Sequence, residues 1–141
     1  MSRTASDVGF LLAKASQRFN ERLGARLAAG GFPDVRPSYG SVLVPLFDGG
    51  PLRIGEVAAA ARLSKQSMTG LVRQCEEAGL VARERDPADG RAFRISLTER
   101  GRALQAVAEQ ALDELDAELD ARLGGRRRDA LIEALKGVMD L

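Results

Sequence analysis

Five residues between positions 65 and 73 carry side chains that suit nucleic-acid binding: Lys65, Gln66, Ser67, Thr69 and Arg73. The Gln66 amide offers a donor beside an acceptor, which matches the major-groove edge of adenine. The two cations can bind guanine or phosphate, and the hydroxyls can bind phosphates or bases. Because any surface helix shows such residues, they become informative only together with the elements around them.

A second group lies in the segment Asp86-Pro87-Ala88-Asp89-Gly90-Arg91, which is dense in turn-forming residues. An arginine at the exposed tip of a hairpin can enter the narrow minor groove of DNA, where the negative potential is enhanced. Asp89 lies two residues from Arg91 and could instead hold it in a salt bridge that stiffens the tip. Both roles for Arg91 remain open.

The sequence lacks most of the side chains on which enzymes and metal sites rely. It has no histidine, which excludes His-based triads and His metal ligands, and its single cysteine cannot build a disulfide or a thiolate zinc site. It also has no phosphate-binding loop and no pair of catalytic carboxylates. We therefore expect no enzyme activity, no metal and no cofactor.

Charge is distributed unevenly along the chain. Residues 53–102 hold 10 Lys and Arg against 7 Asp and Glu, whereas residues 103–123 hold 1 against 6, although the whole chain carries only +1. Such separation can mark a polyanion-binding region and an acidic region that faces away from it. On charge alone, mixed solvated faces are an equally good interpretation.

The hydrophobic pattern predicts the elements that present these residues. Apolar residues at spacings of three or four predict a helix from Val8 that ends at Gly30-Gly31, and a second over about 38–47, with a bend or an early stop at Pro45. Two short helices follow over about 54–60 and 65–78, and Ser64 is the expected N-cap of the latter. In that helix Cys75 lies on the inward face, so we expect a buried thiol rather than a redox sensor.

After Gly79 the pattern changes to alternation, which predicts strands over about 80–85 and 93–97, joined as a hairpin with a long polar tip. Thr98 should cap a long helix to about Leu123, and a last helix follows Gly124-Gly125. The predicted fold class is mainly α with a small β-hairpin, arranged as a winged helix-turn-helix between long terminal helices. In such a fold the second helix of the pair enters the major groove.

The length of 141 residues and the 45% of hydrophobic residues suit one soluble globular domain. No stretch reaches the roughly 18 apolar residues of a membrane span. Residues 1–7 lack the features of a secretory signal, and one cysteine fits a reducing cytosol. We therefore expect a cytoplasmic location and no membrane partner.

Several ordered motifs resemble the MarR (multiple antibiotic resistance regulator) family. They are Pro51-Leu52-Arg53-Ile54-Gly55-Glu56-Val57-Ala58, Leu63-Ser64-Lys65-Gln66-Ser67-Met68-Thr69-Gly70-Leu71-Val72, Glu77-Ala78-Gly79-Leu80-Val81-Ala82-Arg83, Asp86-Pro87-Ala88-Asp89-Gly90-Arg91-Ala92 and Leu97-Thr98-Glu99-Arg100-Gly101. The resemblance implies a homodimeric winged-helix transcription factor, commonly a repressor, that is often released from double-stranded DNA by a small ligand or by oxidation. The expected DNA-binding residues are Ser64, Lys65, Gln66, Ser67, Thr69, Gly70, Arg73, Asp89 and Arg91.

The sequence departs from the family pattern at three places. Gly70 stands where the family usually has an arginine, and Gly90 stands in a wing that often reads Asp-Arg-Arg. Gly70 lowers helix propensity by about 1 kcal/mol and removes an expected DNA contact, although it could also permit close approach to the phosphate backbone. Tyr39-Gly40 replaces the usual Gln-aromatic pair, which affects any inherited ligand chemistry.

We expect a single domain over 1–141, in which about 37–102 form the DNA-binding lobe and about 1–36 and 103–141 form dimerisation helices. Such a dimer would read two half-sites of a palindromic operator about one helical turn apart. The alternative is that the terminal helices only close the core of the monomer. For a small effector, the expected binding residues are Phe19, Tyr39, Leu43 and Phe47 as walls and Arg22 as a carboxylate partner.

Two functions remain for the chain. The first is a sequence-specific, homodimeric DNA-binding transcriptional regulator, most simply a repressor. The second is a winged-helix protein-interaction module that does not read DNA, for which the glycines at positions 70 and 90 are the best support. A mobility-shift assay distinguishes them.

Overall fold

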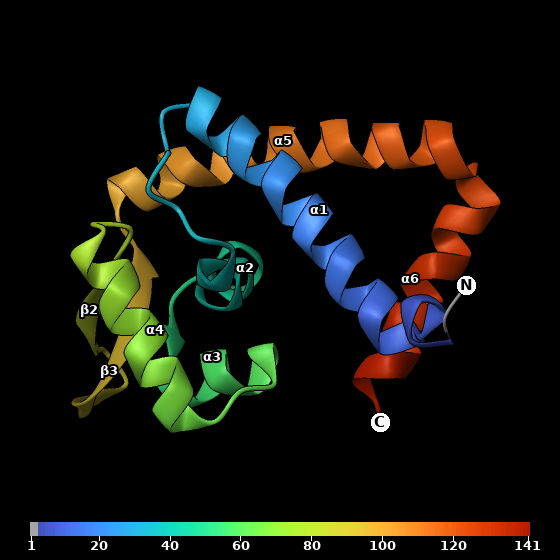
Figure 1. The fold of residues 1–141 in the computed structure, drawn as a ribbon. Coiled ribbons are helices and arrows are strands. Elements are labelled where there is room, and N and C mark those ends of the chain that lie inside the picture. Colours follow the sequence, from blue (N-terminus) through green and yellow to red (C-terminus); the bar gives the residue numbers. More distant parts are fainter. Residues whose placement is uncertain (1–2) are drawn as a thin grey trace.

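The computed structural model describes residues 3–141 and is mainly helical with one small sheet, which confirms the predicted fold class (Figure 1). The elements in chain order are the 3-10 helix η1 (Arg3–Ser6), α1 (Val8–Ala29), the 3-10 helix η2 (Pro37–Tyr39), α2 (Gly40–Gly49), β1 (Leu52–Arg53), α3 (Ile54–Ala61), α4 (Lys65–Glu77), β2 (Val81–Asp86), β3 (Asp89–Leu97), α5 (Glu99–Leu123) and α6 (Gly125–Met139). Among the helices of residues 3–141, none combines the length and the apolar character of a membrane span.

The long helices α1, α5 and α6 extend away from α2, α3, α4 and the sheet, which meet α5 at its start (Figure 1). α5 runs along one edge of the molecule, α6 turns back from its far end, and α1 crosses obliquely from α5. α1 packs against α5 through two ion pairs of Arg26 with Glu114 and Glu118 and through the bonds of Arg22 to Glu118. Arg62, the C-cap of α3, also donates to the Asp140 carboxylate beyond the end of α6 at 2.8 Å.

The core lies where α2, α3, α4 and the sheet meet the first half of α5. Its largest fully buried side chains are Leu46, Met68, Leu80 and Leu104, together with Val42, Val57, Val72 and Cys75. Each such aliphatic side chain contributes about 1.5–3 kcal/mol of transfer free energy on burial. These residues come from four helices and from the turn before β2, so the core fixes α4 relative to both the start of the wing and α5.

Side-chain caps begin the helices on either side of the hairpin. The Ser64 hydroxyl accepts a hydrogen bond from the Ser67 amide at 3.1 Å, and the Thr98 hydroxyl accepts one from the Gly101 amide at 3.1 Å. Both satisfy an otherwise unpaired first-turn donor, and replacing such a cap by alanine typically costs about 0.5–2 kcal/mol. The two caps predicted from the sequence are therefore confirmed.

The sequence predicted a bend or an early stop at Pro45, and the early stop is wrong. α2 begins at Gly40, after the 3-10 turn η2, and continues through Pro45 to Gly49. The proline removes one backbone donor from the helix. Because Val42, Leu43 and Leu46 are buried around it, tertiary packing holds the helix where the local preference opposes it.

The sheet has three antiparallel strands in the order β1-β3-β2, one more than the hairpin predicted from the sequence. Leu52 pairs with Ile95 and Arg53 with Arg94, so β1 is a two-residue strand too short to show alternation. The prediction of a long polar tip for this hairpin is also wrong. Asp86 pairs with Asp89, which leaves a turn of only Pro87 and Ala88, and the Asp86 carboxylate accepts from the Ala88 amide at 2.8 Å.

Gly101 lies at the closest backbone approach between the first turn of α5 and the start of β2. A Cβ at this position would overlap the Leu80 carbonyl oxygen, which also accepts a hydrogen bond from the Thr98 amide at 3.0 Å. Neither backbone can move without disturbing the other, since both belong to the core. At Gly70, by contrast, a Cβ would meet nothing within 4 Å.

We predict that Gly101→Ala lowers the free energy of unfolding by about 1–3 kcal/mol, because the added methyl group overpacks this junction. Gly70→Ala is the matched control, and it should raise the free energy of unfolding by about 0.5–1 kcal/mol through helix propensity. Urea unfolding of both variants measures this. Equal stability of the two variants would show that the junction is not tight.

Cys75 is a free, fully buried thiol on the inward face of α4, which confirms the prediction for its burial. Burial raises the pKa of the Cys75 thiol to about 12. Because the thiolate is the form that oxidants attack, the residue should be unreactive near neutral pH.

Mild peroxide should therefore leave the DNA binding expected from the sequence unchanged in both the parent and Cys75→Ser. The free energy of unfolding of the variant should be lower by about 1–3 kcal/mol, since it buries a hydroxyl in an apolar site. Mobility shifts before and after peroxide, with a urea melt, measure both effects. Release of the parent but not of the variant would contradict the buried-thiol interpretation.

Candidate nucleic-acid interface

The N-terminal end of α4 and the turn between β2 and β3, here called the wing tip, lie at the same end of the molecule (Figure 1). The start of α4 and the wing tip, which are separate in sequence, therefore lie at one end of the fold. A helix and a hairpin placed in this way can occupy neighbouring grooves of a DNA duplex.

Three of the side chains on α4 that were predicted to bind DNA are free to meet a ligand. Lys65, Gln66 and Arg73 are exposed, and none of them has a side-chain hydrogen bond or ion pair to another described residue. Met68, Val72 and Cys75 are buried on the opposite face of the same helix and hold it in place. The helix therefore offers two cations and one amide on a rigid support.

The hydroxyls on the same end of α4 are already engaged. Ser64 donates to the Ser67 hydroxyl at 3.0 Å, and Thr69 donates to the Lys65 carbonyl at 2.8 Å. The Ser67 hydroxyl proton remains available, whereas Ser64 and Thr69 retain only acceptor capacity. Gly70 faces open space, so this part of the surface carries no side chain.

Arg91 is a highly exposed cation of the wing, with 96% of its side chain accessible. Its Nε lies 3.7 Å from the Asp89 carboxylate, which also accepts from the Arg91 amide at 3.1 Å. An ion pair this long and exposed contributes little free energy. The aspartate thus shapes the turn through the backbone, and the guanidinium stays free to reach outward.

Three other arginines near the wing are paired with carboxylates. Arg53 binds Asp86 at 2.8 Å, Arg94 binds Glu84 at 2.7 Å, and Arg83 binds Glu76 at 3.0 Å. The Ala88 amide and then the Arg53 guanidinium lower the pKa of Asp86, since both bind its charged form. Much of the positive charge of residues 53–102 is therefore neutralised locally.

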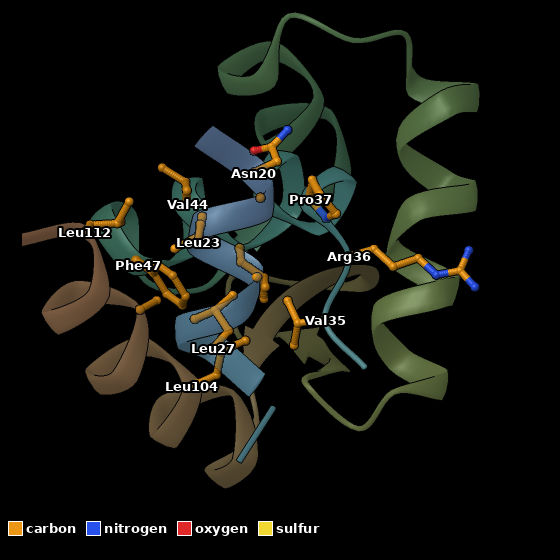
Figure 2. A pocket seen from close by; sticks show the side chains of 14 residues that line it. Asn20, Leu23, Leu27, Val35, Arg36, Pro37, Val44, Phe47, Leu104 and Leu112 are labelled. Carbon is orange, nitrogen blue, oxygen red and sulfur yellow. The ribbon is translucent and has the colours of Figure 1, made fainter. Parts of the chain in front are cut away.

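An apolar cavity of about 120 Å³ lies among α1, α2, α5 and the loop before η2 (Figure 2). Leu43 and Phe47, two of the predicted effector residues, line it. The sequence did not single out the other lining residues, which are Asn20, Leu23, Gly24, Leu27, Val35, Arg36, Pro37, Gly40, Val44, Leu104, Ala108 and Leu112. Arg36 is the one charged residue of this lining, and its side chain extends away from the apolar group (Figure 2).

The remaining predicted effector residues lie elsewhere. Tyr39 is buried in the core, and Phe19 and Arg22 line a separate hollow between α1 and α5. The Arg22 guanidinium donates to the Glu118 carboxylate from Nε at 3.1 Å and from Nη2 at 2.7 and 2.8 Å. Bonding to Arg22 and to Arg26 lowers the pKa of the Glu118 carboxyl. The periodicity of α1 defines its apolar face but cannot reveal a partner 96 residues away.

Comparisons with known proteins agree with this geometry. Residues 37–92 match the family model described as MarR family. An HTH-type transcriptional repressor of Mycobacterium tuberculosis is 40% identical over 72 residues, and the match spans 51% of this chain and about half (52%) of that relative. A second HTH-type regulator of Mycobacterium tuberculosis is 30% identical over 133 residues, which cover 94% of this chain and 88% of the relative.

A solved structure of the transcriptional repressor CouR, bound to a 23-mer DNA duplex, has a TM-score of 0.81 and 26% identity. The alignment covers 99% of this chain and 96% of CouR, so it includes the terminal helices as well as the wing. CouR has also been solved bound to p-coumaroyl-CoA. The family model, the relative that matches over 94% of the chain and the shared winged helix agree. We conclude that the chain belongs to the MarR family of transcriptional regulators.

Proposed function

We propose that the protein is a sequence-specific, homodimeric transcriptional repressor that binds a palindromic operator. The observation that carries this proposal is that α4 carries the exposed side chains of Lys65, Gln66 and Arg73 and begins at the same end of the molecule as the wing tip (Figure 1). Residues 37–102 act as the DNA-binding lobe in this proposal. The free cations and the amide supply donors that a duplex can use.

In the proposed complex α4 enters the major groove and the wing tip meets the adjacent minor groove. Gln66 binds an adenine edge, and Lys65 and Arg73 bind phosphate or guanine. Ser64, Ser67, Thr69 and Asp89 order the two segments, and Gly70 allows close approach of the helix backbone to the duplex. Arg91 reads groove width through its charge.

The terminal helices form the proposed dimer interface. No residue of α6 is buried in the single chain, and large apolar side chains of α1 and α6 are between 38% and 64% exposed. They are Val8, Phe10, Leu11, Leu131, Ile132, Leu135, Val138 and Met139. Exposed apolar groups at this density mark an interaction surface. A two-fold dimer covers them and sets the spacing of two DNA half-sites.

The cavity beside Leu43 and Phe47 is the proposed effector site. It lies between the helices assigned to the dimer and those of the DNA-binding lobe, so a bound ligand touches both. A ligand that fits one arrangement of the two parts better than the other shifts their equilibrium, and with it the affinity for DNA. The relatives bound to DNA and to a small molecule support this assignment by analogy.

A mobility-shift titration on the duplex upstream of the protein's own gene tests the function. The logarithm of affinity should fall linearly with the logarithm of salt concentration, with a slope of about −0.9 per phosphate neutralised. A scrambled duplex is the control and should bind more weakly. Failure to bind either duplex would favour the protein-interaction module instead.

Gln66→Ala and Arg91→Ala separate base reading from backbone contact. Gln66→Ala should cost about 1–3 kcal/mol on the operator and little on scrambled DNA, because it removes one base contact. Arg91→Ala should weaken both duplexes alike and reduce the salt slope by about one unit per half-site. If Gln66→Ala weakens both equally, its amide binds phosphate; if Arg91→Ala changes nothing, the wing tip does not reach DNA.

Leu135→Glu tests the dimer. The side chain is 38% exposed in the single chain, so a carboxylate there should leave the fold intact but place a charge in the proposed interface. We expect a monomer by light scattering and an operator affinity lower by more than about tenfold, since two half-sites are no longer bound together. Lys136→Glu, at the neighbouring exposed position, should remain a dimer; dimeric Leu135→Glu would contradict the proposed interface.

A further inference from the structure

The arginines around the wing fall into two groups. Arg53, Arg83 and Arg94 lie 2.7 to 3.0 Å from carboxylates, so they can bind a phosphate only by giving up an ion pair. Arg91 has a single distant carboxylate at 3.7 Å. Arg85 has no carboxylate partner within the described part of the chain, and it is exposed. Two wing cations are therefore available, of which only Arg91 is at the tip.

Arg85 is held in place by neutral groups. Its guanidinium carbon lies 5.3 Å from the centroid of the Phe93 ring, and Phe93 is its partner across the β2–β3 ladder. One guanidinium nitrogen donates to the Gly90 carbonyl. The aromatic face and the carbonyl fix the guanidinium without cancelling its charge.

The strand register places Arg85 on the side of the wing that faces α4. The pairs Val81–Leu97, Arg83–Ile95 and Arg85–Phe93 are every second pair of the β2–β3 ladder, and their side chains therefore lie on one face of the sheet. Val81 and Ile95 are buried on that face, and Arg83 on the same face binds Glu76 of α4. Arg85 lies two residues nearer the tip, toward the end of the molecule where α4 begins (Figure 1).

We infer that Arg85, supported by Phe93, is a second DNA contact of the wing and binds the phosphate backbone between the groove occupied by α4 and the groove reached by Arg91. This inference rests on the proposed function. A guanidinium already fixed by the protein loses little conformational entropy when it binds, and its planar fork matches a phosphate. Phe93 is a positioning residue in this arrangement, with 48% of its surface left exposed beside the cation.

A purely structural role for Arg85 would be to cover the Phe93 ring with its aliphatic stem. Arg85→Met distinguishes the two roles, because it keeps an apolar stem over the ring and removes the charge together with the hydrogen bond to the Gly90 carbonyl. Arg94→Met is the matched control. It removes the same charge from the same hairpin, but from an arginine paired with Glu84.

The experiment measures binding of the full-length parent and the two variants to operator and scrambled duplexes at several salt concentrations. Arg85→Met should weaken binding to both duplexes by roughly tenfold and reduce the salt slope by about one unit per half-site. Arg94→Met should keep a slope close to that of the parent. Arg85→Lys, which keeps the charge but loses the fixed fork, should retain the slope and bind with intermediate affinity.

Phe93→Leu tests the positioning role. It keeps an apolar side chain but removes the aromatic face, so it should weaken DNA binding severalfold in the parent and change nothing when Arg85 is already methionine. Equal salt slopes for Arg85→Met and Arg94→Met would overturn the inference, as would additive effects of the Arg85 and Phe93 substitutions. Absence of DNA binding by the parent would instead overturn the proposed function.

Discussion

The contact on which the arrangement of this protein depends is the close packing of the first turn of α5 against the start of β2. The Leu80 carbonyl accepts a hydrogen bond from the Thr98 amide at 3.0 Å, and Gly101 lies against the same carbonyl with no room for a Cβ. Thr98 also donates to the Gly79 carbonyl at 2.6 Å. Arg100 adds a bond to Asp34 at 2.9 Å and stacks over Phe32, which ties in the loop after α1. One small junction thereby joins the end of α4, the base of the wing and the start of the long helix.

This junction has a mechanical consequence for the proposed function. Because the Thr98 bonds to Gly79 and Leu80 join the start of α5 to the turn between α4 and β2, α4 and the wing cannot shift independently of the base of α5. The cavity beside Leu43 and Phe47 adjoins the same helix through Leu104 and Ala108. A ligand there would contact the part of α5 against which α4 and the wing are packed. A shift of α5 caused by the ligand would therefore also move the proposed DNA-binding surface.

The sequence predicted those features that depend on local chemistry. Ser64 and Thr98 were predictable as caps, and the spacing of Met68, Val72 and Cys75 was enough to predict the buried face of α4. Features that depend on distant partners were not predictable. β1 has only two residues and exists because β3 is available to pair with it, and Arg22 is occupied by Glu118 from another helix. Pro45 shows the same limit, since burial of its neighbours overrides a local preference.

The distribution of free and paired cations refines the electrostatic argument from the sequence. Residues 53–102 carry a net excess of positive charge, but this excess does not equal the number of cations that can bind DNA. Arg53, Arg83 and Arg94 are each paired with a carboxylate. The cations that remain available are Lys65 and Arg73 on α4, Arg85 and Arg91 on the wing, and Arg102 on α5, which donates to the Leu97 carbonyl. Gly70 and Gly90 leave open space in these same segments. In the proposed complex Arg85, which lies on β2, therefore supplies a positive charge that the wing tip lacks at position 90. The number of cations that meet the duplex thus depends on the strand register as well as on the sequence of the tip.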